Sequence, residues 1–110
     1  MKPIEKYVEA MENKDFAALA EMFTKDGILS DYCANSSAQK EYHIYGKEAI
    51  NMFFRNRFGF RQYSIAEAEV VNDTQAEFVA NFGGYNIMAI ATVREVNEDG
   101  LIQMLTVRPK

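Results

Sequence analysis

The chain has 110 residues, 48% of them hydrophobic and 25% charged, which suits one globular domain over residues 1–110. Its net charge of −4 and pI near 5.0 exclude a strongly basic chain, so we expect no nucleic-acid partner. No run approaches the roughly twenty apolar residues of a membrane helix. With no signal-peptide pattern at the start, and a single cysteine that leaves no internal disulfide, we expect a cytoplasmic protein without a membrane partner.

The first quarter of the chain has apolar residues at helical spacing. Ile4, Tyr7 and Met11 fall on one face, which predicts an amphipathic helix over 3–13. Asp15 is a suitable cap for a second helix over about 15–25.

A mixed segment follows the second predicted helix. Residues 28–33 are mostly apolar and predict a short strand, whereas 34–39 are small and polar and predict a loop. Whether that loop closes over a ligand stays open. Alternation over 41–45 predicts a second strand, and 47–57 returns to helical spacing.

From residue 61 the apolar period changes from about 3.6 to 2. The predicted strands cover 61–71, 75–83, 85–97 and 101–108. The last two carry apolar residues on both faces, as expected if helices cover one face and a partner subunit the other. We therefore predict an α+β fold with a strongly curved, mainly antiparallel sheet, a cavity between sheet and helices, and a homodimer formed through the outer sheet face.

Three segments carry a family resemblance. They are Tyr7 to Met11, Asp15 to Phe23, and Gly46 to Ile50 with the Phe53-Phe54 pair after it. Their order and spacing resemble the SnoaL-like branch of the nuclear-transport-factor-2-like (NTF2-like) superfamily over nearly the whole chain. The resemblance implies a cone of three helices and a bent, cystatin-like sheet.

Within that superfamily the sequence most resembles ketosteroid isomerases, which use an Asp base and an oxyanion hole of a Tyr and a protonated Asp. The resemblance places the oxyanion Tyr on Tyr7 and the base on Asp31. The second oxyanion carboxyl falls on Ala91, so this part is missing, and a supporting Tyr is replaced by Phe54. Because one lost oxyanion donor costs about 10²–10³ in rate, residual catalysis remains an open question.

Four other side chains have both a chemical and a structural interpretation. His43 could pair with Asp31 in catalysis, although a solvent-facing strand residue explains it equally. Arg55 and Arg57 could orient an anionic or epoxide substrate, as the resemblance to one hydrolase branch of the superfamily, where an Arg lies between two Asp, would imply. The second Asp of that triad is not evident in the sequence, and a favourable interaction of the two cations with the helix dipole is the simpler interpretation. Cys33 is most simply a small buried residue.

We expect no cofactor and no metal site. The catalytic candidates are Asp31, Tyr7 and His43. The candidates for ligand contact, which the sequence does not separate from ordinary core, are Phe23, Phe54, Phe78, Phe82, Ala91 and Met104. Three functions remain open: isomerisation of a small apolar carbonyl compound, non-catalytic binding of a hydrophobic molecule, and a structural homodimer.

Overall fold

The computed structural model describes residues 1–33, 41–60 and 63–110. The elements in chain order are α1 (Pro3–Glu12), α2 (Phe16–Glu21), β1 (Phe23–Asp31), β2 (Tyr42–Tyr45), α3 (Lys47–Phe60), β3 (Tyr63–Val70), β4 (Gln75–Phe82), β5 (Tyr85–Val96) and β6 (Ile102–Pro109). The α+β class predicted from the sequence is confirmed. The predicted loop 34–39, and with it the question of a lid, lies outside the described residues.

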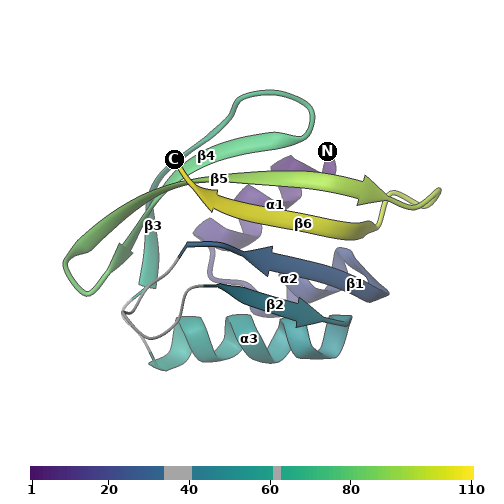
Figure 1. Cartoon of the computed structure of the whole chain (residues 1–110), viewed down its shortest axis with the longest axis horizontal. Coiled ribbons are helices and arrows are strands. Elements are labelled where there is room, and N and C mark those ends of the chain that lie inside the picture. The colour runs from purple at the N-terminus through teal and green to yellow at the C-terminus, as the bar shows by residue number, and fades with distance from the viewer. Residues whose placement is uncertain (34–40, 61–62) are drawn as a thin grey trace.

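All six strands form one curved sheet in the order β2-β1-β6-β5-β4-β3 (Figure 1). The β1–β6 pair is parallel and the other four pairs are antiparallel, so the sheet is mixed. Helix α1 contacts β3, β4 and β5, while α3 contacts β1 and β2. The helices therefore cover one face of the sheet, which we call the inner face. No helix of the described residues covers the other face, which we call the outer face.

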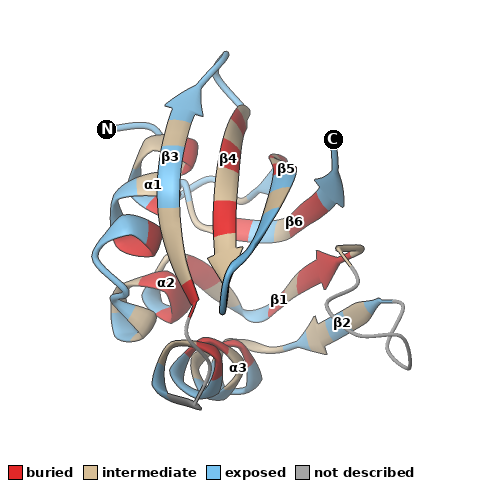
Figure 2. Cartoon of the chain, turned by 90° about the vertical axis from the view of Figure 1, so that its left-hand side faces the viewer, coloured by how far each residue is buried: buried red, intermediate tan, exposed pale blue. Residues whose placement is uncertain are grey.

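Burial follows from this arrangement. Along β4, buried residues alternate with half-buried ones, as a strand with one covered face requires (Figure 2). The largest fully buried side chains are Tyr7, Phe23, Phe54, Ile4, Leu19, Leu29, Ile50, Ile102 and Leu105. They come from the helices and from the inner face, which places the core between these two layers.

The second helix is shorter than its sequence predicts. The pattern indicated a helix over about 15–25, but α2 ends at Glu21 and β1 begins at Phe23. Phe23 pairs with Ile102 of β6, whose backbone N–H donates to the carbonyl oxygen of Met22 at 2.8 Å. This long-range strand pairing holds the backbone at Phe23 in an extended conformation and overrides the local helix propensity.

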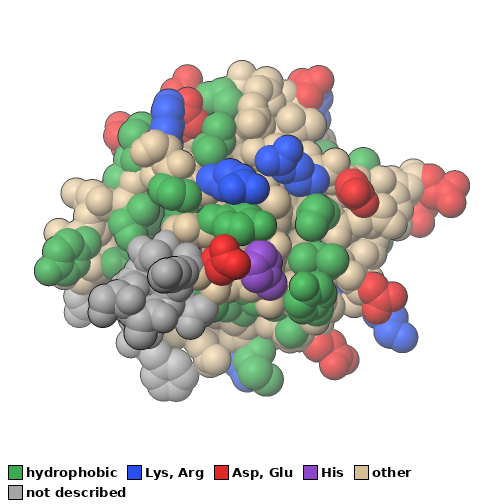
Figure 3. Space-filling model, viewed as in Figure 1, with side chains coloured by type: hydrophobic (Ala, Val, Ile, Leu, Met, Phe, Trp, Pro, Cys, Tyr) green, Lys and Arg blue, Asp and Glu red, His purple; other side chains and the backbone are tan. Residues whose placement is uncertain are grey.

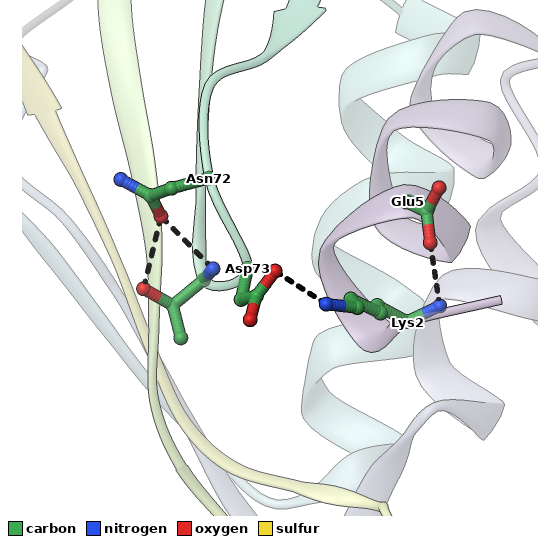
Figure 4. Close-up of polar contacts among 5 residues, drawn as sticks. Lys2, Glu5, Asn72 and Asp73 are labelled. Carbon is green, nitrogen blue, oxygen red and sulfur yellow. Dashed lines mark hydrogen bonds and ion pairs between the residues drawn. The ribbon is translucent and has the colours of Figure 1, made fainter.

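The start of α1 is tied to the turn between β3 and β4 (Figure 4). The Lys2 backbone N–H donates to Glu5 Oε1 at 2.7 Å, and its ammonium group pairs with Asp73. Asn72 Oδ1 accepts hydrogen bonds from the backbone N–H of Thr74 at 3.0 Å and from its hydroxyl at 3.3 Å, which orders the turn. Because these groups are exposed, they fix geometry more than they stabilise the fold.

Candidate functional site

A buried ion pair lies between α3 and the end of β1. Arg57 Nη1 donates to Asp31 Oδ2 at 3.0 Å, and the two side chains are only 8% and 5% exposed. The other carboxylate oxygen, Oδ1, accepts the backbone N–H of Cys33 at 2.9 Å. Both oxygens of the carboxylate are thus engaged, and the pair is compensated in charge as buried ions must be.

Aromatic rings surround the Arg57 guanidinium. Its central carbon lies 4.4 Å from the ring centroid of Phe53, 5.2 Å from that of Tyr63 and 5.6 Å from that of Phe82. These distances allow cation–π attraction, which is stronger where water is excluded. The rings and the carboxylate together hold the cation in the interior.

The ion pair opens onto a small pocket on the inner face. Its cavity volume is about 10 Å³, which is space for about one water molecule. The lining residues are Asp31, Cys33, Arg57, Tyr63, Phe78, Ala80, Phe82, Ile87, Ala89 and Val107. Phe82 and Ile87 are only half-buried, so their side chains can move more readily than those of the core. A ligand larger than water requires such movement.

Three titratable groups near the ion pair, Tyr7, Cys33 and Tyr63, are uncharged at neutral pH. Burial raises the pKa of Tyr7 well above its usual value, and nearby Tyr63 and Asp31 raise it further. Burial also raises the pKa of Tyr63. Burial, followed by the effect of Asp31, raises the pKa of Cys33 to about 12. The two phenols can therefore donate hydrogen bonds, whereas the thiol is a poor nucleophile.

The structure brings some of the sequence-derived candidates together. Asp31, Phe78 and Phe82 line the same pocket. Tyr7 is 1% exposed and lies within electrostatic reach of Asp31. Ala91 is fully buried and shares a cross-strand row with Asp31, because both pair with Val107 of β6. The position expected for a second carboxyl therefore lies on the correct face but carries only a methyl group.

Other candidates lie elsewhere. His43 pairs with Ser30 in the β1–β2 ladder, and its Nδ1 is 2.9 Å from Ser30 Oγ. Met104 pairs with Ile28 on the same face as Ser30. Since successive residues of a strand point to opposite faces, His43 and Met104 lie on the outer face, away from Asp31. The structure therefore does not form the His43–Asp31 pair.

The two remaining ligand candidates do not line the pocket either. Phe54 is 1% exposed and its ring packs between Phe53 and Phe58, at centroid distances of 5.2 and 5.8 Å. Phe23 borders a separate surface groove of about 1020 Å³ between α2, β1 and α3. Within the described residues, Phe23 and Phe54 are therefore core residues and not pocket residues.

Arg57 is the site residue that the preferred sequence interpretation missed. We interpreted Arg55 and Arg57 together as cations favoured by the end of a helix, but only Arg55 is exposed. The signal was present in the spacing, because Ile50, Phe54 and Arg57 share one helix face. An arginine in phase with buried apolar residues needs an interior partner, and Asp31 is that partner.

Two other features are absent from the described residues. No group of three or more His, Cys, Asp or Glu side chains is arranged to hold a metal ion in the part of the chain that the structure describes. In the same part, no helix has both the length and the apolar character to cross a membrane.

Solved structures provide the comparison by fold. An NTF2-like protein of unknown function from Burkholderia xenovorans LB400 is similar with a TM-score of 0.69 at 14% identity, covering 97% of this chain and 79% of that one. A cystatin-like protein from Silicibacter pomeroyi DSS-3 is similar with a TM-score of 0.66 at 12% identity, covering 98% and 73%. The chain has the NTF2-like fold. No protein-family model matches the sequence, and neither does any curated protein.

Two further solved structures of similar fold are of proteins whose names state a function. A "putative ketosteroid isomerase" from Kribbella flavida DSM 17836 is similar with a TM-score of 0.66 at 15% identity, covering 98% of this chain and 75% of that one. A computationally designed 17-OHP binder is similar with a TM-score of 0.66 at 18% identity, covering 96% and 86%. At these identities the similarity shows the fold, and activity must be argued from the site.

Proposed function

We propose that this domain binds a small, largely apolar molecule in the pocket at the Asp31–Arg57 pair, with a polar group of the ligand directed at that pair. The observation that carries the proposal is a compensated, deeply buried ion pair that opens onto an apolar, aromatic-lined cavity of an NTF2-like fold. A few polar groups in an apolar pocket are the usual composition of a ligand site. The similarity in fold to a designed 17-OHP binder supports the same class of function.

The small cavity requires that ligand binding widens the pocket. The side chain of Ile87 is half-buried in its wall, so Ile87→Ala enlarges the pocket without removing a core residue. Val79→Ala is the matched control, since Val79 is also half-buried but lies on the outer face of β4.

The test is thermal unfolding with a panel of neutral ketones, amides and a steroid ketone. We expect ligand to raise Tm with the concentration dependence of a single site. Ile87→Ala should strengthen binding at least threefold, and Val79→Ala should leave it unchanged. No stabilisation of either the wild type or Ile87→Ala by any compound would refute the proposal.

Isomerisation with Asp31 as base and Tyr7 as donor is the second candidate. It is favoured by the burial of both groups and by their electrostatic interaction. Against it, both oxygens of the carboxylate already accept hydrogen bonds, so a substrate proton must compete with these donors. Deuterium exchange at the α-carbon of bound ketones separates the functions: exchange faster in the wild type than in Asp31→Asn supports catalysis.

We also propose that two copies of the chain associate through the outer face and that the protein works in the cytoplasm. Met88 and Tyr45, 48% and 68% exposed, lie on that face, and covering them would remove apolar surface from water. The face also carries the half-buried Thr92, so the proposed interface mixes apolar and polar contacts. Light scattering that gives a monomer at micromolar concentration would refute association.

A further inference from the structure

The charge balance of the pocket restricts the ligand. Asp31 and Arg57 form a one-to-one pair at 3.0 Å, and both are removed from water. Among the described residues around them, Tyr7, Cys33 and Tyr63 stay protonated at neutral pH because burial raises their pKa values. The described walls therefore have zero net charge.

A charged ligand has no free counter-ion among the described residues that line the pocket. A carboxylate would be attracted by Arg57 and repelled by Asp31 at nearly the same distance, and an ammonium group would meet the reverse. Either ion would lose its hydration without gaining a partner, which is unfavourable in an apolar pocket. A neutral group loses less hydration, and the ion pair can still exchange hydrogen bonds with it.

We infer that the pocket selects a neutral ligand, such as an amide, alcohol or ketone, over carboxylates and amines of the same shape. This inference rests on the proposed function, since it names the class of ligand for the same pocket. It also implies that the selectivity resides in the pairing of Asp31 with Arg57. Removing one charge should therefore invert the preference instead of abolishing binding.

The experiment compares three probes that share one ring: benzamide, benzoate and benzylammonium. Their affinities are measured with the full chain at pH 7 by NMR titration. In the wild type, benzamide should bind at least tenfold more tightly than either ion. In Asp31→Asn the unpaired guanidinium should make benzoate the tightest, and in Arg57→Met benzylammonium should become the tightest. Asp26→Asn, which removes an exposed carboxylate from the same strand, should keep the order of the wild type.

A second measurement uses formate and formamide, which are small enough that the pocket need not widen. Asp31→Ala removes the carboxylate and leaves space for formate beside Arg57, so formate should raise the Tm of this variant more than formamide does. The Tm of the wild type should respond equally to both. A similar rise with formate in wild type and variant overturns the inference, as does benzoate binding the wild type as tightly as benzamide.

The two readouts separate this inference from the proposed function. If no ring probe binds while formate stabilises only Asp31→Ala, the charge argument stands and the proposed function fails for ligands of that size. If ring probes bind without regard to charge, the proposed function stands and the inference fails. If neither effect is seen, both fail.

Discussion

Replacing Arg57 by Met tests the energetic basis of the site. The substitution leaves the Asp31 carboxylate 5% exposed and, among the described residues, without its cationic partner, while the Cys33 backbone N–H still donates to it. Removing one member of a buried pair typically costs about 3–5 kcal/mol. For 110 residues the unfolding entropy is about 0.23 kcal/mol/K, so each 1 kcal/mol corresponds to about 4 °C. We expect Tm to fall by about 12–20 °C.

The reverse substitution should cost less. Asp31→Asn leaves the guanidinium of Arg57 unpaired, but the rings of Phe53, Tyr63 and Phe82 still face the cation and retain part of its stabilisation. The double variant should lose less free energy of unfolding than the sum of the two single variants, by about 1–3 kcal/mol. If Arg57→Met does not fold, Arg57→Gln, which removes the charge but keeps a hydrogen-bond donor, replaces it in the cycle.

The assay is urea unfolding followed by circular dichroism at 25 °C and pH 7. The Lys47–Glu21 pair is the matched control, because its atoms approach to 2.9 Å but its side chains are 35% and 71% exposed. Its coupling should be below about 0.5 kcal/mol. Equal coupling in the two pairs, or a loss below about 1 kcal/mol for Arg57→Met, would refute the view that the buried pair is structurally required.

Three further predictions concern pH, packing and assembly. Since the pKa of Cys33 rises from 9.0 to about 12 on folding, the unfolded chain loses this proton first. The contribution of Cys33 to the free energy of unfolding should then be full below pH 9 and should be lost between pH 9 and 12. In urea titrations the wild type should lose stability between pH 9 and 10, and Cys33→Ala should not. Gly27→Ala should destabilise the protein by about 1–3 kcal/mol, because a Cβ at this position would lie 3.0 Å from the backbone oxygen of Ile102. Gly59→Ala should not destabilise it, because Gly59 lies in a helix and a Cβ there would meet open space. Thermal unfolding of the two variants tests this, and equal losses of stability would contradict the packing argument. Met88→Glu should shift light scattering towards a monomer if the outer face forms a dimer, and an unchanged mass would contradict that interface.

Most helices and strands can be predicted from the sequence, because the patterns of apolar residues that indicate them are local. Helix α1 was predicted over 3–13 and lies at Pro3–Glu12, since an amphipathic stripe identifies itself without reference to the rest of the chain. The strands after residue 61 were predicted to within a few residues, because period 2 and turn residues are equally local. The error at the end of α2 arose where a long-range pairing, Phe23 with Ile102, determined the backbone.

The site was predictable only in part. Asp31 was identified through the family resemblance, and its burial is now evident. A relation between Arg57 and an Asp was only the less favoured alternative, because Asp31 and Arg57 are 26 residues apart and no local pattern joins them. Whether His43 faced Asp31 was likewise a question of strand register, and the register places His43 opposite Ser30.

The sequence by itself therefore determined the element types, the α+β class and the apolar faces, since each follows from the period of the side chains along the chain. Only the tertiary structure decided which buried charge meets which, on which face each candidate lies, and how little space remains beside them. Those properties depend on the pairing of segments distant in sequence. A change of one residue in strand register would transfer Asp31 from the pocket to the outer face.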